Sequence, residues 1–261
     1  MQTLFRNKYV LDFVTTIIFF TRIPINWFNF SDKTPDLTKA AWAFPLAGFL
    51  IGFLSGVVGD FFIFLGLPVF LCCIISITLS VLLTGAFHED GLADSADGLG
   101  AGGTPKKIDE IIHDSRLGTY GVSALVLGLL LRLSLTLSFV DLGYSLISIL
   151  SIGFASGKLA IIYTRKFLNK SKFAKLGSIV GEISNKSLFY ATLIWILVAL
   201  IIFPFYGILF GTIFMAIVIY ILGQMSKKAL GGITGDILGA VAFLTELAFL
   251  FGNLILIFII N

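Results

Sequence analysis

Long apolar stretches constrain this chain more than any other feature of its sequence. A helix needs about 20 mainly apolar residues to cross the roughly 30 Å of hydrocarbon in a bilayer. Seven stretches approach or exceed that length: Ala40–Leu65, Val69–Phe87, Thr119–Val140, Tyr144–Tyr163, Leu188–Phe203, Ile208–Leu222 and Gly239–Ile260. Only 13% of the residues are charged, about half the share usual in soluble domains. The sequence therefore predicts an all-α, polytopic integral membrane helix bundle and excludes a soluble protein.

A shorter apolar segment, Tyr9–Phe20, precedes the seven predicted spans. It contains Asp12 and is closely followed by Pro24, so we expect an interfacial or re-entrant helix rather than a further span. No small-residue cleavage site follows it, and we do not expect a removed signal peptide. Residues 1–261 are expected to form a single membrane-embedded domain.

The basic residues indicate how the bundle is oriented. Of the 18 Lys and Arg residues, 16 lie before the first span or in three of the connections between spans. The alternate connections, Gly66–Pro68, Asp141–Gly143 and Pro204–Gly207, contain none. Because basic loops stay in the cytoplasm, we expect a multi-pass protein of the cytoplasmic (inner) membrane whose functional site faces the cytoplasm. A net charge of +3 is too balanced for a nucleic-acid-binding protein.

Two basic residues, Arg132 and Lys158, fall inside predicted spans. A charged side chain is costly in lipid, so both are expected to face the bundle interior or to snorkel towards the interface. Glu246, about three turns into the last span, is an acid that could pair with one of them.

Acidic side chains cluster directly after the second predicted span, between His88 and Gly98. If that span continues as a helix, Asp90, Asp94 and Asp97 occupy positions i, i+4 and i+7 on one face. Three neighbouring carboxylates repel one another unless a cation is present. Oxygen ligands at a membrane edge suit Mg²⁺, which completes its shell with water and substrate phosphates. The pattern predicts a Mg²⁺ site, with a solvated acidic helix end as the alternative.

The two residues before Asp90 are interpreted separately. Glu89 points about 100° away from Asp90 on such a helix, so we exclude it from the site and expect its replacement by leucine to be tolerated. His88 could be a ligand, a base or an interfacial residue.

Three other places on the same side could bind phosphate. Arg116 can hold a phosphate by two parallel hydrogen bonds, or it can simply pair with Asp114. The glycine-rich run that ends at Asp236 could form an anion or metal cradle at a helix N-terminus, or Thr234 or Asp236 could only cap that helix. Arg22 could point into the same cleft, although an anchoring role is the simpler interpretation.

These residues together favour a membrane enzyme that uses a Mg²⁺–carboxylate site on a phosphate or pyrophosphate. A membrane transporter is the alternative from another class. Transporters keep their carboxylates and broken helices near the bilayer midplane, often in two related halves. Here the acids lie at a predicted membrane edge and the sequence shows no internal repeat, which favours the enzyme.

Motifs along the whole chain also follow a known family pattern. They are Phe20-Thr21-Arg22-Ile23-Pro24, Phe44-Pro45-Leu46, Phe87-His88, Asp90-Gly91-Leu92-Ala93-Asp94, Asp97-Gly98, Asp114-Ser115-Arg116-Leu117-Gly118-Thr119, Leu230-Gly231-Gly232, Thr234-Gly235-Asp236 and Leu238-Gly239-Ala240. In these motifs the chain resembles the cobalamin synthase (adenosylcobinamide-GDP ribazoletransferase) family. Two positions depart from the pattern: Glu89 stands where an apolar residue is usual, and Phe243 stands where a glutamate is expected.

The resemblance implies that adenosylcobinamide-phosphate is transferred from adenosylcobinamide-GDP to α-ribazole or its 5′-phosphate. The reaction releases GMP and forms adenosylcobalamin or its 5′-phosphate, with Mg²⁺ as cofactor. The residues carried over are catalytic Asp90 and Asp97, metal ligands Asp90, Asp94 and Asp97, and substrate-binding Arg22, His88, Asp114, Arg116, Thr234 and Asp236. A CDP-alcohol-phosphotransferase-like membrane enzyme is the alternative within the enzyme class, although the Ala-Arg pair of its pattern is absent. The expected partners are these substrates and the lipid bilayer; a homo-oligomer is left open.

Overall fold

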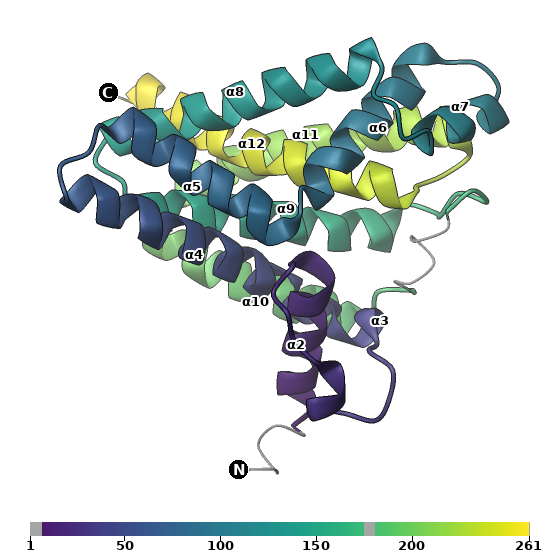
Figure 1. Ribbon diagram of the computed structural model, residues 1–261, viewed down its shortest axis with the longest axis horizontal. Helices are drawn as coiled ribbons and strands as arrows, with labels where there is room; N and C mark the ends of the chain where they lie inside the picture. Colours follow the sequence, from purple (N-terminus) through teal and green to yellow (C-terminus); the bar gives the residue numbers. More distant parts are fainter. Residues whose placement is uncertain (1–6, 175–180, 261) are drawn as a thin grey trace.

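A computed structural model describes residues 7–174 and 181–260, which form α-helices and short connections without a strand of a β-sheet (Figure 1). The helices are α2 (Lys8–Phe20), α3 (Leu37–Ala40), α4 (Phe44–Phe64), α5 (Val69–Thr84), α6 (Phe87–Ala101), α7 (Pro105–Ile112), α8 (Thr119–Asp141), α9 (Leu146–Phe167), α10 (Asn185–Ile202), α11 (Phe205–Leu230) and α12 (Gly235–Ile260). Two short 3-10 turns, Trp27–Asn29 and Ala41–Ala43, lie between α2 and α4.

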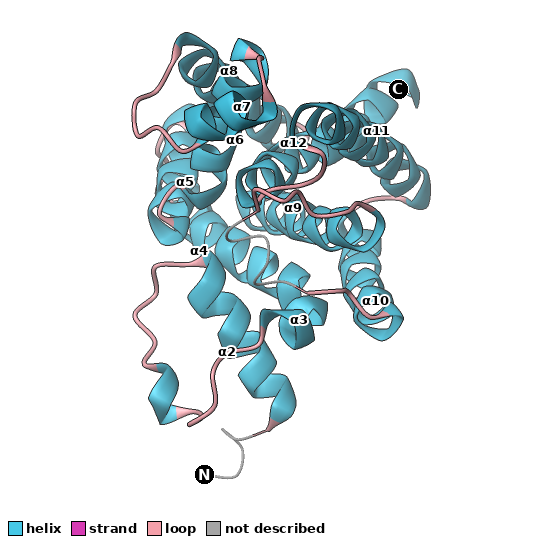
Figure 2. Ribbon diagram, turned by 90° about the vertical axis from the view of Figure 1, so that its right-hand side faces the viewer, coloured by secondary structure: helices cyan, strands magenta, loops and turns pink. Residues whose placement is uncertain are grey.

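The described chain contains the predicted membrane bundle. Six helical segments are long and apolar enough to cross a bilayer, and α5 with α6 supplies a seventh if the pair counts as one bent span. This confirms an all-α, multi-pass membrane protein with about seven spans. Helix α2 has 13 residues, too few to cross, and it runs across the direction of the bundle helices (Figures 1 and 2).

Two helices are longer than their apolar stretches. The sixth predicted span ends at Leu222, but α11 continues to Leu230. Lys227 and Lys228 therefore lie in its last turn, where cations interact favourably with the helix dipole, and not in a connection. The last helix begins at Gly235, four residues before the predicted start. A helix need not end at the edge of the hydrocarbon, so hydropathy alone misplaces these boundaries.

The predicted continuity between the second span and the acidic segment is wrong. Gly85 (φ 64°) and Ala86 (φ 59°) both adopt left-handed backbone conformations, which end α5 and turn α6 by 85°. Glycine takes this conformation without steric cost, and the side chain of Arg22 occupies the space next to Gly85. The helical spacing of the acids is nevertheless confirmed, because α6 covers all of them.

A stripe of glycines explains how closely the central helices pack. Gly48, Gly52 and Gly56 lie four residues apart on α4, and a Cβ at any of them would strike the backbone of α9. Small residues at such spacing allow close helix contact in membranes. Helix α9 is consequently buried along most of its length, with α12 beside it in the interior (Figure 2).

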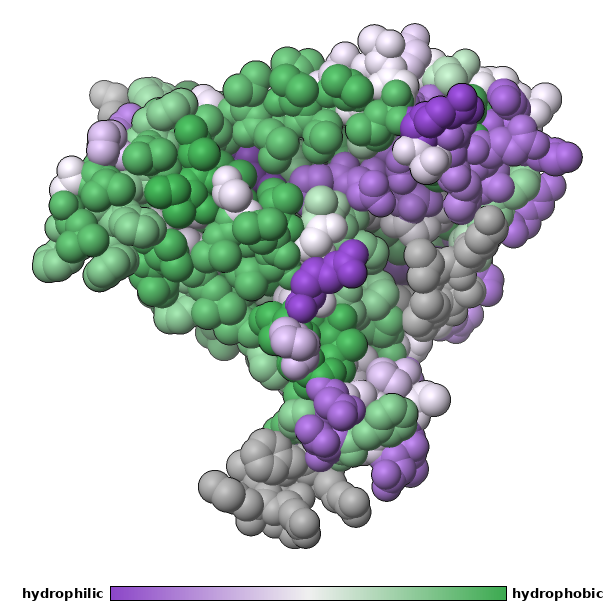
Figure 3. Space-filling view, viewed as in Figure 1, coloured by the Kyte–Doolittle hydropathy of each residue, from purple (hydrophilic) through white to green (hydrophobic). Residues whose placement is uncertain are grey.

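Polar side chains gather at one end of the bundle. In Figure 3 the face over α4, α5 and α8 is largely hydrophobic, and hydrophilic residues concentrate around α7 and the adjoining end of α6. A band of hydrophilic residues continues from there along α6, beneath α8. A polar site would therefore lie at this end.

Candidate active site

Helices α6 and α12 cross at two glycines. A Cβ on Gly91 would lie 2.8 Å from the Asp236 carbonyl oxygen and 3.0 Å from the Gly239 Cα. A Cβ on Gly239 would in turn lie 3.2 Å from the Gly91 Cα. Real Cβ atoms are not tolerated so close to another backbone. The glycines thus allow the contact that brings Asp90, next to Gly91, towards the first turn of α12.

Three of the predicted site carboxylates meet around this crossing. Asp94 lies near enough to Asp90, Asp236 and Asp97 to interact with their charges, and it also interacts with His113, which follows the end of α7. Asp90, Asp94 and Asp236 form no ion pair and no hydrogen bond to another described side chain. These carboxylates therefore have oxygen atoms available for a ligand, and their mutual repulsion favours a cation.

Within residues 7–174 and 181–260, no three His, Cys, Asp or Glu side chains converge tightly enough to hold a metal by themselves. Mg²⁺ does not require such a cage, because it is commonly held by one or two carboxylates together with water and substrate phosphates. The Mg²⁺ site at Asp90, Asp94 and Asp97 stays a prediction.

Asp97 already has two backbone partners. Its Oδ2 accepts a hydrogen bond from the Gly118 N–H at 2.7 Å, and its Oδ1 accepts one from the Gly121 N–H at 2.8 Å. Gly118 is the N-cap of α8, so the carboxylate satisfies free N–H groups at a helix N-terminus. Asp97 thereby ties α6 to α8. Each carboxylate oxygen keeps a further lone pair. The role of Asp97 as metal ligand or base remains a prediction.

Arg116 is paired with Asp114. Its Nε and Nη2 donate to the two carboxylate oxygens at 3.1 and 2.7 Å, and its side chain is otherwise exposed. The hydrogen bonds from Arg116 lower the pKa of Asp114 to about 2. This is the simpler of the two interpretations given above. The pair borders an open cavity of about 440 Å³ that Asp97 also lines, so Arg116 remains placed to meet a ligand there.

His88 lies in the interior next to the crossing. It is 3% exposed, its ring stacks on Phe20 with centroids 5.8 Å apart, and neither ring nitrogen has a hydrogen-bond partner. Together with Asp90 and Asp236 it lines a second cavity, of about 120 Å³.

Thr234 and Arg22 lie at the edges of this region. Thr234 is buried, and its hydroxyl accepts a hydrogen bond from the Ile237 N–H at 3.4 Å, as expected for a residue that caps α12. Arg22 is exposed, lies against Gly85 at the α5–α6 bend and does not line the 120 Å³ cavity. The substrate-binding roles of both residues stay predictions.

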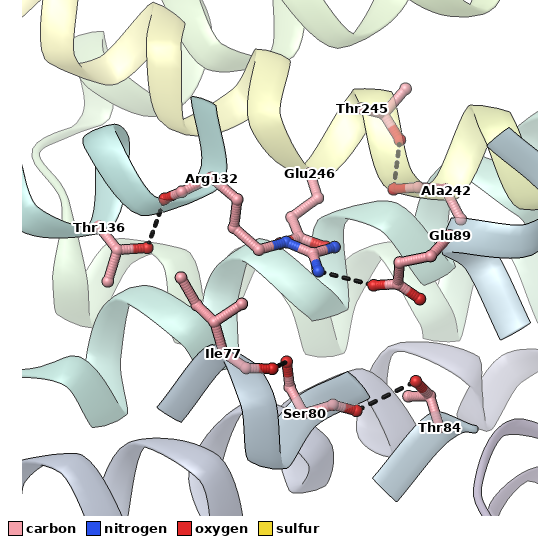
Figure 4. Close-up of polar contacts among 9 residues, drawn as sticks. All are labelled: Ile77, Ser80, Thr84, Glu89, Arg132, Thr136, Ala242, Thr245 and Glu246. Carbon is pink, nitrogen blue, oxygen red and sulfur yellow. Dashed lines mark hydrogen bonds and ion pairs between the residues drawn. The ribbon is translucent and has the colours of Figure 1, made fainter. Parts of the chain in front are cut away.

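Three buried charged residues, Arg132, Glu89 and Glu246, form one network (Figure 4). Arg132 of α8 is held by Glu246 of α12, with Nε to Oε1 at 2.9 Å and Nη2 to Oε2 at 3.0 Å, and by Glu89 of α6, with Nη1 to Oε1 at 2.6 Å. Its guanidinium also lies 4.2 Å from the ring centroid of Phe243. Of the two partners that the sequence left open for Glu246, Arg132 and Lys158, the structure pairs it with Arg132. Glu89 is paired with Arg132, and its exclusion from the site stays a prediction. Its buried ion pair argues against the expectation that leucine would be tolerated there.

The structure brings two groups close to the site that were not among the predicted site residues: His113, and Lys158, which was expected only to face the bundle interior or to snorkel. At the C-cap of α7, His113 Nδ1 lies 2.8 Å from the Asp109 carbonyl oxygen and 3.3 Å from its Oδ1, and His113 interacts with the charges of Asp94 and Asp236. The i, i+4 spacing of this pair was the available signal. On α9, Lys158 is 1% exposed, with its Nζ 5.7 Å from the Phe20 ring centroid.

Comparison with known proteins fits this arrangement. A family model described as Cobalamin-5-phosphate synthase matches residues 12–254. Proteins named adenosylcobinamide-GDP ribazoletransferase are similar over most of the chain: one from Azorhizobium caulinodans is 37% identical, covering 95% of this chain and 97% of its own. The relative from Clostridium botulinum strain Langeland is 35% identical (92% and 95%), and the one from Shewanella pealeana is 37% identical (88% and 89%). No solved structure matches.

The family match and the relatives agree with the motifs identified in the sequence, and they favour neither a CDP-alcohol phosphotransferase nor a transporter. Because the family model spans most of the described helices and the relatives align along nearly the whole chain, this protein belongs to the cobalamin-5-phosphate synthase family.

Proposed function

We propose that this protein transfers adenosylcobinamide-phosphate from adenosylcobinamide-GDP to α-ribazole or its 5′-phosphate. The products are GMP and adenosylcobalamin or its 5′-phosphate. The observation that carries the proposal is the meeting of Asp90, Asp94 and Asp236 at the polar end of the bundle, without ion-pair partners in the described chain. The names of the relatives support the same substrates.

Mg²⁺ fits this set of donors. The three carboxylates offer hard oxygen ligands, and Mg²⁺ takes its remaining ligands from water and phosphate. We propose that Asp90 and Asp94 of α6 hold the ion, with Asp236 facing them from α12. When bound, the ion would neutralise the diphosphate of the donor and stabilise the departing GMP.

In this reaction a hydroxyl oxygen of the acceptor attacks the phosphorus nearest cobinamide, and the bond from that phosphorus to the oxygen bridging it to GMP breaks. The hydroxyl proton must pass to a base. Asp97 or Asp90 is proposed for this role, since a carboxylate within hydrogen-bonding reach can accept it. Arg116, and Arg22 at the helix bend, are proposed to bind phosphate oxygens, because a guanidinium can donate two parallel hydrogen bonds.

The site is proposed to face the cytoplasm from the inner membrane. The connections between α6 and α8 and between α9 and α10 carry basic residues, and Lys227 and Lys228 lie in the last turn of α11 at the same end, whereas the opposite turns carry none. The positive-inside rule assigns the basic end to the cytoplasm, where nucleotide-activated donors are available.

The proposal is tested with purified protein in detergent, adenosylcobinamide-GDP and α-ribazole, following GMP release. We expect turnover with Mg²⁺, loss of turnover with EDTA and recovery when Mg²⁺ is restored in excess. Asp90→Asn, Asp94→Asn and Asp236→Asn should each reduce turnover at least about 100-fold, the scale on which a lost transition-state interaction is felt. Asp141→Asn, at the opposite end of α8, is the matched control. Absence of GMP release by the wild-type protein would overturn the proposed function.

A further inference from the structure

The cavity of about 120 Å³ between α2, α6 and α12 is lined mainly by aromatic side chains. Its walls include Phe19, Phe20, Phe44, Phe87, His88 and Ile161. Phe20 packs edge-on against Phe44 with centroids 4.9 Å apart, and Phe19 packs in the same way on Phe87 at 5.4 Å. The walls of this cavity offer the faces and edges of aromatic rings, which suit a flat aromatic ligand.

One polar side chain that lines this cavity lacks a hydrogen-bond partner. His88 lines the cavity, is almost completely buried, and has no hydrogen bond at either ring nitrogen in the described chain. A neutral imidazole presents one N–H donor and one acceptor, and burying them unsatisfied costs free energy. A ligand that brings a ring nitrogen into the cavity would satisfy one of them. The unpaired imidazole of His88 therefore indicates a ligand in this cavity, independently of the aromatic walls.

We propose that this cavity binds the flat aromatic base of the acceptor nucleoside. The inference rests on the proposed function and names the part of the site that receives the acceptor. A closed apolar cavity of roughly 150 Å³ holds benzene; this cavity of about 120 Å³ is smaller but partly open, so it can admit only part of a two-ring base. The outer ring of the fused two-ring base of α-ribazole would enter it, and His88 would hydrogen-bond to the free nitrogen of that base.

The chemistry of the walls argues against the guanine of the donor as the occupant. Guanine carries several hydrogen-bonding groups, and burying these without partners is costly. Asp90 and Asp236 also line the cavity, but they are the carboxylates proposed to hold or face Mg²⁺, so they would not be free to accept hydrogen bonds from the N–H groups of guanine. A base with a single free ring nitrogen loses little on entering such a cavity, whereas guanine loses several hydrogen bonds to water.

The position of the cavity also suits the acceptor. Asp90 and Asp236 contribute to the lining, so a sugar attached to the bound base lies beside the carboxylates. A hydroxyl or phosphate on that sugar would then be presented to the groups proposed to hold Mg²⁺ and to accept the proton. The same cavity thus fixes the acceptor in position and excludes water from its base.

Ile161 gives a matched pair of variants at one wall position. Ile161→Phe should fill the cavity and raise the KM for α-ribazole at least about tenfold, because an overfilled site must push its guest out. Ile161→Val should leave room, with a KM within about threefold of the wild-type value. His88→Phe keeps an aromatic ring but removes both nitrogens, and should raise the same KM about tenfold, the worth of one buried hydrogen bond. The KM for adenosylcobinamide-GDP should not change in any of the three.

A binding measurement separates this inference from the proposed function. Benzimidazole, titrated calorimetrically into the wild-type protein without donor, should bind, and Ile161→Phe should abolish the binding. If the wild type releases GMP but Ile161→Phe leaves both benzimidazole binding and the KM for α-ribazole unchanged, the inference is overturned and the function stands. If Ile161→Phe instead raises the KM for the donor and not for the acceptor, the cavity binds guanine, and the inference is likewise overturned. Thermal unfolding of each variant shows that the bundle is intact.

Discussion

Arg132 Nη1 lies 2.6 Å from Glu89 Oε1, an ion pair that joins α8 to α6 in the interior of the bundle. Glu246 holds the other edge of the same guanidinium, and Phe243 lies against its face. Glu89 and Phe243 are also the two positions at which the chain departs from the expected family pattern. Both side chains contact one guanidinium. We infer that the two departures implied by the resemblance are a single exchange, in which α6 supplies a carboxylate in place of one on α12.

Reversing the exchange is the first prediction. Glu89→Leu leaves Arg132 with one carboxylate in a buried setting and should destabilise the protein by about 3–5 kcal/mol. Phe243→Glu alone adds a third buried carboxylate and should also destabilise. The double variant Glu89→Leu/Phe243→Glu should recover most of the loss, because position 243 faces the same guanidinium. The midpoint of thermal unfolding in detergent measures all three.

The control is Glu89→Leu/Phe243→Leu, which removes the phenyl ring without returning a carboxylate. It should be no more stable than Glu89→Leu alone. If Glu89→Leu/Phe243→Glu unfolds at as low a temperature as the single variants, the two departures from the family pattern are independent.

The second prediction concerns Asp97. Asp97→Asn keeps one acceptor for the Gly118 or Gly121 N–H but turns an NH₂ donor towards the other, so one buried N–H loses its partner. This should destabilise the protein by about 1–3 kcal/mol, measured by thermal unfolding, and α6 and α8 should loosen together. Full stability combined with complete loss of GMP release would contradict this and would favour Asp97 as metal ligand or base alone.

Local patterns predicted much of this structure. The apolar stretches predicted the spans because crossing a bilayer requires a fixed helix length. The spacing of Asp90, Asp94 and Asp97 predicted a helix with these acids near one another, and α6 confirms it. The cost of an isolated charge in lipid predicted that Glu246 would pair with Arg132 or Lys158, and the structure shows Arg132 as the partner.

The features that the sequence did not predict depend on contacts between distant segments. The bend at Gly85 and Ala86 places α6 against α12, and a single glycine in an apolar stretch does not distinguish such a bend from a continuous span. The partners of Asp97 lie 21 and 24 residues away, and Arg132 lies 43 residues from Glu89. Helical periodicity could exclude Glu89 from the site, but it could not show that α8 places a guanidinium against it.

The third prediction tests Arg116 as a phosphate ligand. Arg116→Lys keeps the charge but loses the planar fork, so the KM for adenosylcobinamide-GDP should rise about tenfold in the GMP-release assay. Asp114, with its pKa lowered to about 2, is ionised at neutral pH. Because the pKa of Asp114 is lowered, its carboxylate is ionised and paired with Arg116 at every pH above the ordinary carboxyl value of 3.8. The ion pair is lost only as the pH falls towards 2. The increase in KM caused by Arg116→Lys should therefore be the same across the neutral range, from about pH 6 to about pH 8. An unchanged KM would leave Arg116 as the partner of Asp114 only.

The last prediction concerns the crossing that brings the carboxylates together. A Cβ at Gly91 meets the Asp236 carbonyl oxygen and the Gly239 Cα, which are backbone atoms and cannot rotate away. Gly91→Ala should therefore push α6 from α12, separate Asp90 from Asp236 and lower GMP release by about 10- to 100-fold, as small misplacements of reacting groups do. Gly223→Ala is the matched control, since the new Cβ meets only the side chain of Leu168 and both changes raise helix propensity equally. Equal turnover by the two alanine variants would show that the site does not depend on how closely α6 approaches α12.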